Sequence, residues 1–281
     1  FNKGFLEAGF AREVQPVEGR SDRVDLVYRI TEGARRYVNR VLVSGLENTR
    51  RHIVDQQVSL EAGEPLSQLD LLETQRRLYD LGIFHKADLA VQNPEGEERH
   101  KNVLLQLEEA RRYTISVGGG ADIARFGGDD NLAATEGRTG FSPRVSFGVT
   151  RLNFRGLNHT LAFKSRFSTL QQRALLSYTA PRVWNVPALT LVFNTFVDHS
   201  FDVLTFASER LEGSVALEHK RSRSDTLFYR YSYRRVRATR DTLKVSVDLI
   251  PLFARPVRVG LLGASFVRDR RDDPADSKRG M

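Results

Sequence analysis

The sequence predicts an α+β segment followed by a long series of antiparallel strands. A helix runs directly into a strand over residues 71–91, where apolar residues recur at the helical period and Gly82 provides the stop. From Arg111 onward, helical periodicity gives way to short segments of period two, separated by clusters of Gly, Pro, Asn and Asp. The chain contains no cysteine, which excludes disulfides and thiolate metal sites.

Length and charge limit the classes of partner. The chain has 281 residues and a formal net charge of +8, with 43 Lys and Arg against 35 Asp and Glu. The basic residues are dispersed, so we expect no nucleic-acid partner, and no apolar run approaches the roughly 18 residues of a transmembrane helix. Because the chain starts at Phe1, without methionine and inside a predicted helix, we expect a piece of a longer precursor.

Residues 36–109 predict the element order β-α-α-β-β. A strand covers residues 37–43, a first helix begins near Asn48, and Ser67 caps a second helix with Asp70 three residues later. The apolar face of this second helix consists of Leu71, Leu72, Leu78 and Tyr79. After Gly82, apolar and polar residues alternate, which predicts a strand with one buried face.

Residues 1–33 predict a helix and two strands, at 11–17 and 24–30, with a turn at 18–22. They repeat the end of the next segment. Leu6-x-x-Gly9-Phe10 corresponds to Tyr79-x-x-Gly82-Ile83-Phe84, with the two glycines 73 residues apart. Such a spacing predicts tandem copies of one small unit, of which the first lacks its front half. Two unrelated helix-to-strand turns are the alternative.

Eight further strands are predicted near 112–121, 143–154, 159–168, 173–180, 187–197, 206–220, 225–236 and 257–268. One face of several strands is apolar and the other is charged. In the seventh, for example, Leu227, Tyr229, Tyr231 and Tyr233 oppose Arg230, Ser232 and Arg234. A soluble β-sandwich and an outer-membrane barrel both produce this alternation.

Strand length and loop length favour the barrel. Strands of about nine to twelve residues suit a tilted membrane crossing, whereas soluble strands average nearer six. Compact connections at 155–158, 182–185 and 221–224 alternate with longer ones at 122–142, 198–205 and 237–256. Short turns on one side and long loops on the other are typical of outer-membrane barrels.

With both parts in place, the chain resembles the BamA family of outer-membrane assembly and transport barrels, which are preceded by polypeptide-transport-associated (POTRA) domains. Residues 41–45, 63–66 and the junction Tyr79-x-x-Gly82-x-Phe84 are similar to parts of a POTRA domain. Residues 153–158 resemble the first periplasmic turn of the barrel, and 269–274 with Arg279-Gly280 resemble the turn after strand eight. The resemblance implies the end of a preceding POTRA domain at 1–34, a complete POTRA domain at 35–110 and the N-terminal half of the barrel at 111–281.

The chain also departs from the family pattern. Family barrels have about sixteen strands, and a large loop with a Val-Arg-Gly-Phe motif enters their lumen; no such motif occurs here. Eight strands would fill a closed small barrel poorly with the expected lumen-facing charges, which are Lys164, Arg166, Arg230 and Arg234. We therefore expect a partial barrel.

The resemblance implies a non-enzymatic protein of the bacterial outer membrane, with its N-terminal part in the periplasm, that assembles or inserts client proteins. Clients would pair with the edge strand of the POTRA domain, formed by Lys86, Ala87, Asp88, Leu89, Ala90 and Val91. The first barrel strand would be one side of a lateral gate, formed by Tyr113, Thr114, Ile115, Ser116, Val117, Gly118, Gly119 and Gly120. Implied partners are unfolded outer-membrane or secreted clients, accessory assembly lipoproteins and outer-membrane lipid.

Alternatives remain open at this point. One is a pore of the two-partner-secretion type or a TamA-like translocation and assembly barrel. Another is a soluble two-domain binding protein with a β-sandwich.

No catalytic, cofactor-binding or metal site is predicted. The glycines at 118–120, with Gly127-Gly128 after them, lack the following helix that a phosphate loop requires. The six histidines, at 52, 85, 100, 159, 199 and 219, show no metal-ligand spacing. Asp272, Asp273 and Asp276 lie next to three arginines, which favours a salt-linked turn over a cation site. Basic turns such as 220–223 are either solvated or face anionic lipid headgroups.

Overall fold

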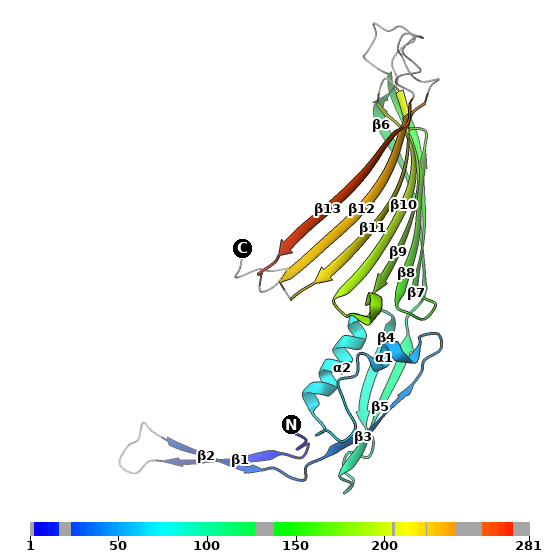
Figure 1. Ribbon diagram of the computed structural model, residues 1–281. Helices are drawn as coiled ribbons and strands as arrows, with labels where there is room; N and C mark the ends of the chain where they lie inside the picture. The colour runs from blue at the N-terminus through cyan, green and yellow to red at the C-terminus, as the bar shows by residue number, and fades with distance from the viewer. Residues whose placement is uncertain are drawn as a thin grey trace. The chain divides into compact units, whose positions relative to one another are not determined.

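The computed structural model describes residues 3–16, 24–126, 138–203, 206–222, 224–239 and 255–271 (Figure 1). Contacts divide the chain into two compact units. The first comprises residues 1–111 together with Arg155–Leu157, and the second comprises 112–154 with 158–281. Among the residues described, no helix combines the length and apolar character needed to cross a membrane.

The first unit begins with an antiparallel hairpin of β1 (Gly9–Pro16) and β2 (Val24–Thr31). Phe10 lies opposite Ile30, and on the other face Glu13 forms an ion pair of 3.2 Å with Arg29. The helix predicted before β1 is wrong for residues 3–8, which form turns and an isolated bridge. Arg36 N–H donates to the Gly4 carbonyl at 2.7 Å, so this segment uses its backbone groups to pair with the chain beyond β2. Phe1 and the predicted turn at 18–22 lie outside the described residues.

The rest of the first unit is a three-stranded sheet with two helices. In chain order the elements are β3 (Tyr37–Ser44), α1 (Arg51–Asp55), α2 (Gln68–Asp80), β4 (Phe84–Val91) and β5 (His100–Glu109). The sheet order is β3-β5-β4, with β5 parallel to β3 and antiparallel to β4. β5 is therefore central, and β4 lies at an edge.

Both ends of α2 follow from its sequence. The Ser67 hydroxyl accepts the Asp70 N–H at 3.3 Å, as predicted for the cap. Gly82 has φ +67, the left-handed conformation that ends a helix cheaply in glycine. The predicted apolar face is only partly correct: Leu78 is fully buried, but Leu72 is 57% exposed, because its six-residue separation from Leu78 places it on a different side of the helix.

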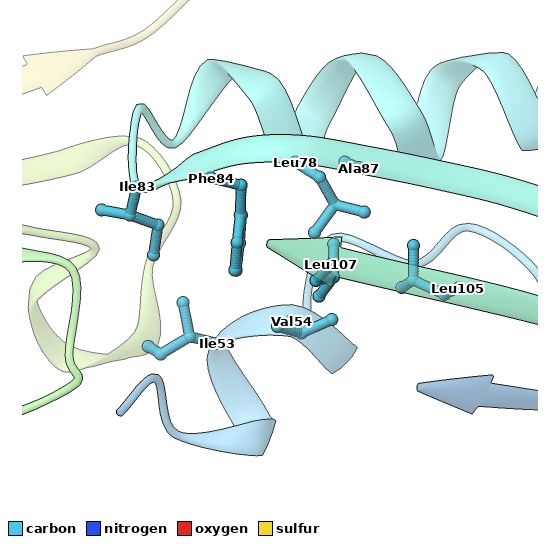
Figure 2. Close-up of a cluster of buried hydrophobic side chains, with 8 residues drawn as sticks. All are labelled: Ile53, Val54, Leu78, Ile83, Phe84, Ala87, Leu105 and Leu107. Atoms are coloured by element: carbon cyan, nitrogen blue, oxygen red, sulfur yellow. The ribbon is translucent and has the colours of Figure 1, made fainter. Parts of the chain in front are cut away.

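The core of this unit lies between the helices and one face of the sheet. Figure 2 shows its main cluster, which consists of Ile53, Val54, Leu78, Ile83, Phe84, Ala87, Leu105 and Leu107. These side chains come from α1, α2, the loop before β4, and strands β4 and β5. The alternating pattern of both strands thus buries one face under helices.

The second unit is one antiparallel sheet of eight strands in sequence order, from β6 to β13. The strands are β6 (Tyr113–Phe126), β7 (Arg138–Phe154), β8 (His159–Ser168), β9 (Gln171–Pro181), β10 (Leu189–Val203), β11 (Phe206–Lys220), β12 (Asp225–Ala238) and β13 (Val257–Arg268). All eight predicted strands are present. Within the described residues β6 and β13 pair with one neighbour each, so both are edges.

Two predicted loops differ from the structure. The loop predicted at 122–142 is shorter, because β6 continues to Phe126 and β7 starts at Arg138. Residues 198–205 do not form a long connection, because β10 continues to Val203 and β11 starts at Phe206. Asp198 pairs with Arg210 and Ser200 with Ser208, so polar residues extend the ladder beyond the apolar part of the strands. The loop cores at 127–137 and 240–254 lie outside the described residues.

The pairing assigns every side chain of the sheet to one of two faces. Lys164, Leu175, Phe196, Glu212 and Arg234 are opposite one another across five strands and share what we call the polar face. By the same alternation Arg166 and Arg230 lie on the polar face. The other, apolar face carries large side chains such as Val117, which is 76% exposed. The four predicted lumen charges therefore share one face.

Candidate functional site: two strand edges

The sites predicted for client pairing lie on β4 and β6, and each strand borders its sheet. An edge strand presents backbone N–H and C=O groups that another strand can pair with. In an antiparallel pair alternate residues direct both groups toward the partner, so the remaining residues direct theirs outward. The pairing register thus identifies which residues carry each open edge.

On β4 the outward residues are Ala87, Leu89 and Val91. Gln92 N–H donates to the Asn102 carbonyl at 2.8 Å, and this bond fixes the phase of the pairing with β5. Lys86, Asp88 and Ala90 share that phase and therefore face β5. Of the six predicted residues, half already use their backbone groups inside the sheet.

Helix α2 covers one of the three outward positions. The Gln75 side-chain amide donates to the Ala87 carbonyl at 2.7 Å, and Ala87 N–H donates to the Tyr79 hydroxyl at 3.2 Å. Ala87 is fully buried. Both of its edge groups are thus satisfied, and we call Gln75 and Tyr79 the latch. The open part of the edge is the stretch with Leu89 and Val91.

The latch was not predicted from the sequence. The sequence places Tyr79 on the apolar face of α2 and predicts no role for Gln75. The available signal was helical spacing: Gln75 and Tyr79 are four residues apart, so their side chains lie on one face of α2. Nothing in the sequence says that this face lies beside the backbone of Ala87.

On β6 the outward residues are Tyr113, Ile115, Val117, Gly119 and Ala121. Leu152 N–H donates to the Arg112 carbonyl at 2.7 Å, and this bond places the even-numbered residues toward β7. Thr114, Ser116, Gly118 and Gly120 therefore carry no open edge groups. No side-chain hydrogen bond to the outward groups of β6 is found in the part of the chain described. The β6 edge thus lacks a latch of the kind seen on β4.

The three consecutive glycines of β6, at 118–120, occur there for different structural reasons. A Cβ at Gly118 would lie 2.6 Å from the Ser146 hydroxyl, and one at Gly120 would lie 3.1 Å from the Arg144 guanidinium. Both glycines make room for side chains of β7 on the polar face. Gly119 has nothing within 4 Å, so space alone does not require a glycine there. Gly127 and Gly128 lie outside the described residues.

The polar face is crossed by ion pairs. Arg144 bonds Asp122 at 3.0 Å, Arg173 bonds the buried Asp198 at 3.1 Å, and Arg234 bonds Glu212. Lys164, Arg166 and Arg230 belong to no ion pair within the described ranges. A carboxylate accompanies some of the cations but not all, which leaves this face with an excess of positive charge.

The carboxylate of Glu109, at the end of β5, holds the segment that precedes α1 by several hydrogen bonds. It accepts the backbone N–H groups of Asn48 and Thr49 at 2.9 and 2.7 Å, and the Thr49 hydroxyl at 2.7 Å. Burial raises the pKa of Glu109, but the bonds from Thr49 and Asn48 outweigh it and lower the pKa to about 2. These bonds also explain why α1 starts at Arg51 and not near Asn48: the preceding N–H groups are directed at the carboxylate.

Metal-binding geometry is absent from the described residues, where no three His, Asp or Glu side chains form a group that could hold an ion. His159 contacts the Tyr178 hydroxyl through its Nδ1 at 2.6 Å. Asp272, Asp273, Asp276, Arg279 and Gly280 lie outside the description.

The chain is similar in sequence and in structure to known proteins. Residues 153–281 match the Omp85 superfamily domain. Among curated proteins, the outer membrane protein assembly factor BamA of Nitratidesulfovibrio vulgaris is 24% identical over 164 residues, covering 57% of this chain and 18% of that protein. The chain thus spans about a fifth of this relative.

Two solved structures share the fold. The crystal structure of BamA from Haemophilus ducreyi lacking POTRA domains 1–3 has a TM-score of 0.71 at 14% identity, covering 98% of this chain and 52% of that one. CdiB from Acinetobacter baumannii has a TM-score of 0.51 at 13% identity, covering 95% and 48%. The predicted resemblance to the BamA-like superfamily is confirmed, and the chain spans about half the length of these structures.

Proposed function

From the Omp85 superfamily domain at residues 153–281, we propose that the chain is part of a non-enzymatic bacterial outer-membrane protein that assembles or inserts client proteins. Residues 35–110 act as a periplasmic POTRA domain, 1–34 are the end of a preceding copy, and 111–281 are the first half of the barrel. The apolar face of the eight-stranded sheet lies in lipid, where large exposed side chains are favourable.

The open edge of β6 is the observation that carries this proposal. In hydrocarbon an unpaired backbone group costs several kcal/mol, so such an edge strongly favours pairing with another strand. Ile115 and Val117 place apolar side chains beside the open groups, on the face assigned to lipid. A client strand with the same alternation would satisfy the edge and continue the apolar face.

The first unit supplies a second, smaller pairing site. Leu89 and Val91 of β4 offer main-chain groups that accept extended segments with little regard for sequence. We propose that this edge receives unfolded outer-membrane or secreted clients before insertion. Accessory lipoproteins remain partners that the family resemblance implies.

A secretion pore is the second candidate. The fold likeness to CdiB and the cationic excess of the polar face favour it, because a charged, wet lumen suits passage of a polypeptide. In a pore the substrate contacts the polar face, whereas in an insertion factor it pairs with the β6 edge. Crosslinking from the two locations separates these functions.

Proline substitution on β6 tests the edge directly. Val117→Pro removes one outward N–H and leaves every β6–β7 bond intact, whereas Val117→Ala keeps that N–H and only trims the side chain. With a cysteine replacing Gly119, where a side chain has room, we expect Val117→Pro to lower the yield of client adducts about fivefold, equivalent to about 1 kcal/mol for one hydrogen bond.

Two controls accompany this experiment. Ser116→Pro removes an N–H that faces β7, so it should weaken the sheet itself. We therefore expect this variant to lose the heat-modifiable mobility of the outer-membrane fraction, and not to lose client adducts selectively. Heat-modifiable mobility in the Val117 variants shows that the barrel is intact, and a soluble product would return the sheet to a sandwich. Equal adduct yields from Val117→Pro and Val117→Ala contradict pairing at this edge.

A further inference from the structure

Two turns of the eight-stranded sheet and the segment after its last strand form a basic rim at one end. Because consecutive strands alternate in direction, the connections β9–β10 and β11–β12 and the segment after β13 emerge at the same end. We call these residues the rim: Arg182, Val183, Trp184, Lys220, Arg221, Arg270 and Arg271. Each of these three segments contributes at least one arginine.

Trp184 is presented outward at this rim. It is the single tryptophan of the chain, and it is 77% exposed. Its φ of 55° lies in the left-handed region, which a large aromatic residue rarely occupies. Hydrogen bonds from Asn185 N–H to the Arg182 carbonyl at 3.0 Å and from Val186 N–H to the Val183 carbonyl at 3.1 Å hold this turn. Strain of this kind is found where a residue has a task beyond packing.

The rim keeps a net positive charge after its own ion pairs. Asp225 accepts Arg268 at 2.8 Å, Asp269 accepts Arg271 at 2.6 Å and Lys220 lies 3.8 Å from Glu218, so each of these acids has a cation of its own. Arg221 and Arg270 are exposed and take part in none of the ion pairs found among the described residues. An anionic partner would therefore meet cations that no carboxylate already neutralises.

The rim also borders the apolar face. Leu189 lies opposite His219, His219 opposite Leu227, and Leu227 opposite Phe266, which makes these side chains the first row of the apolar face beside the turns. Tryptophan is enriched at the level where the apolar part of a bilayer meets its headgroups, because its ring is apolar and its N–H is polar. Cations just outside that level attract anionic lipids.

We propose that this rim docks on anionic phospholipid headgroups, with Trp184 at the boundary of the hydrocarbon and the rim arginines against the phosphates. The proposal rests on the proposed function in one respect, the placement of the apolar face in lipid. It adds a lipid selectivity at the turn end, with Arg221 and Arg270 as the groups that produce it.

The single tryptophan allows a direct test. The full chain is reconstituted into mixed phosphatidylcholine and phosphatidylglycerol vesicles in which one lipid at a time carries brominated acyl chains, and quenching of Trp184 fluorescence is measured. We expect phosphatidylglycerol to be preferred beside Trp184 about fivefold, the ratio that corresponds to about 1 kcal/mol for one cation near an anionic surface. The preference should weaken at high salt.

Matched charge removal locates the effect. The double variant Arg221→Gln and Arg270→Gln should make the two lipids nearly equal, whereas Lys164→Gln and Arg166→Gln, which remove the same charge from the polar face, should leave the preference unchanged. Equal quenching by both lipids in an inserted, heat-modifiable chain contradicts the docking alone. A chain that inserts into neither kind of vesicle contradicts the docking and the proposed function together.

Discussion

The two sheets of this protein use the same alternation of apolar and polar residues but are covered differently. In the three-stranded sheet the apolar side chains of β4 and β5 are buried beneath α1 and α2 (Figure 2). In the eight-stranded sheet the corresponding face is exposed, and Leu262 on β13 is 81% accessible. Alternation therefore determines which face of a sheet is apolar and leaves open what covers it.

Hairpin β1–β2 belongs to the first unit, but its apolar face is exposed as in the eight-stranded sheet. Its pairing places Phe10, Val14, Leu26 and Ile30 on one face, and Phe10 is 69% exposed. A two-stranded hairpin is marginal by itself, so an apolar face of this size needs a cover. The equivalent hairpin β4–β5 has one in α2, whereas residues 3–8, which precede β1, form turns and an isolated bridge.

The largest expected difference between the sheets concerns removal of one leucine side chain. Leu78→Ala in α2 should destabilise the first unit by about 2–5 kcal/mol, because Leu78 is fully buried and leaves a cavity. Leu262→Ala should cost the second unit less than about 1 kcal/mol, because its side chain touches solvent or lipid. Denaturant titration of the full chain in micelles measures both.

Two optical signals keep the units apart in that titration. The helical circular dichroism reports the first unit, since α1 and α2 are the α-helices of the described residues, and Trp184 fluorescence reports the second. An equal loss for both leucines would mean that the apolar face of the large sheet is packed against protein, and the comparison between the sheets would fail.

Sequence reasoning predicted the elements well and their contacts poorly. Period two, turn residues and the Ser67 cap are local signals, so all eight strands and α2 are present as predicted, although β6, β7 and β10 extend beyond their predicted ends at 121, 143 and 197. The latch joins Gln75 to Ala87 and the carboxylate of Glu109 joins Thr49 sixty positions earlier, and neither pairing has a local signal. The wrong loop at 198–205 has a similar cause: polar residues there suggested a loop, but cross-strand partners such as Arg210 keep them in the ladder.

An intermediate effect is expected at Glu109, which has no counterpart in the large sheet. Its folded pKa is about 2 against an ordinary value of 4.5, so its contribution is present above pH 4.5 and is lost as the pH falls toward 2. Glu109→Gln should lower the unfolding free energy of the first unit by about 2 kcal/mol at pH 7, after allowance for partial exposure. Glu108→Gln, one residue away and exposed, is the control.

The pH profile of the Glu109 variant is the sharper measurement. Helical circular dichroism in denaturant, recorded from pH 7 down to pH 3, should show the native first unit losing stability while the Glu109→Gln variant changes less, so the two converge. If the difference between them is constant over this range, the carboxylate is not the group that holds residues 48 and 49.

The smallest effect on stability is expected at the latch, where the two strand edges differ. Gln75→Ala and Tyr79→Phe each remove one hydrogen bond to Ala87 and should cost about 1 kcal/mol each. Both changes open a third outward position on β4, so pairing of an extended peptide with this edge should increase. Crosslinking of the peptide to a cysteine replacing Ala90 measures this, with Arg76→Ala as an exposed control on the same helix.

This experiment decides whether the latch makes the β4 edge less accessible to a peptide than the β6 edge. If the latch limits pairing at β4, the double variant should capture the peptide severalfold better than the native chain, although it is less stable. Adducts at β6 should be unchanged, because no hydrogen bond of the latch kind covers that edge within the described residues. If capture at β4 falls in step with stability, Gln75 and Tyr79 only support the strand, and the edges of β4 and β6 differ in length and not in access.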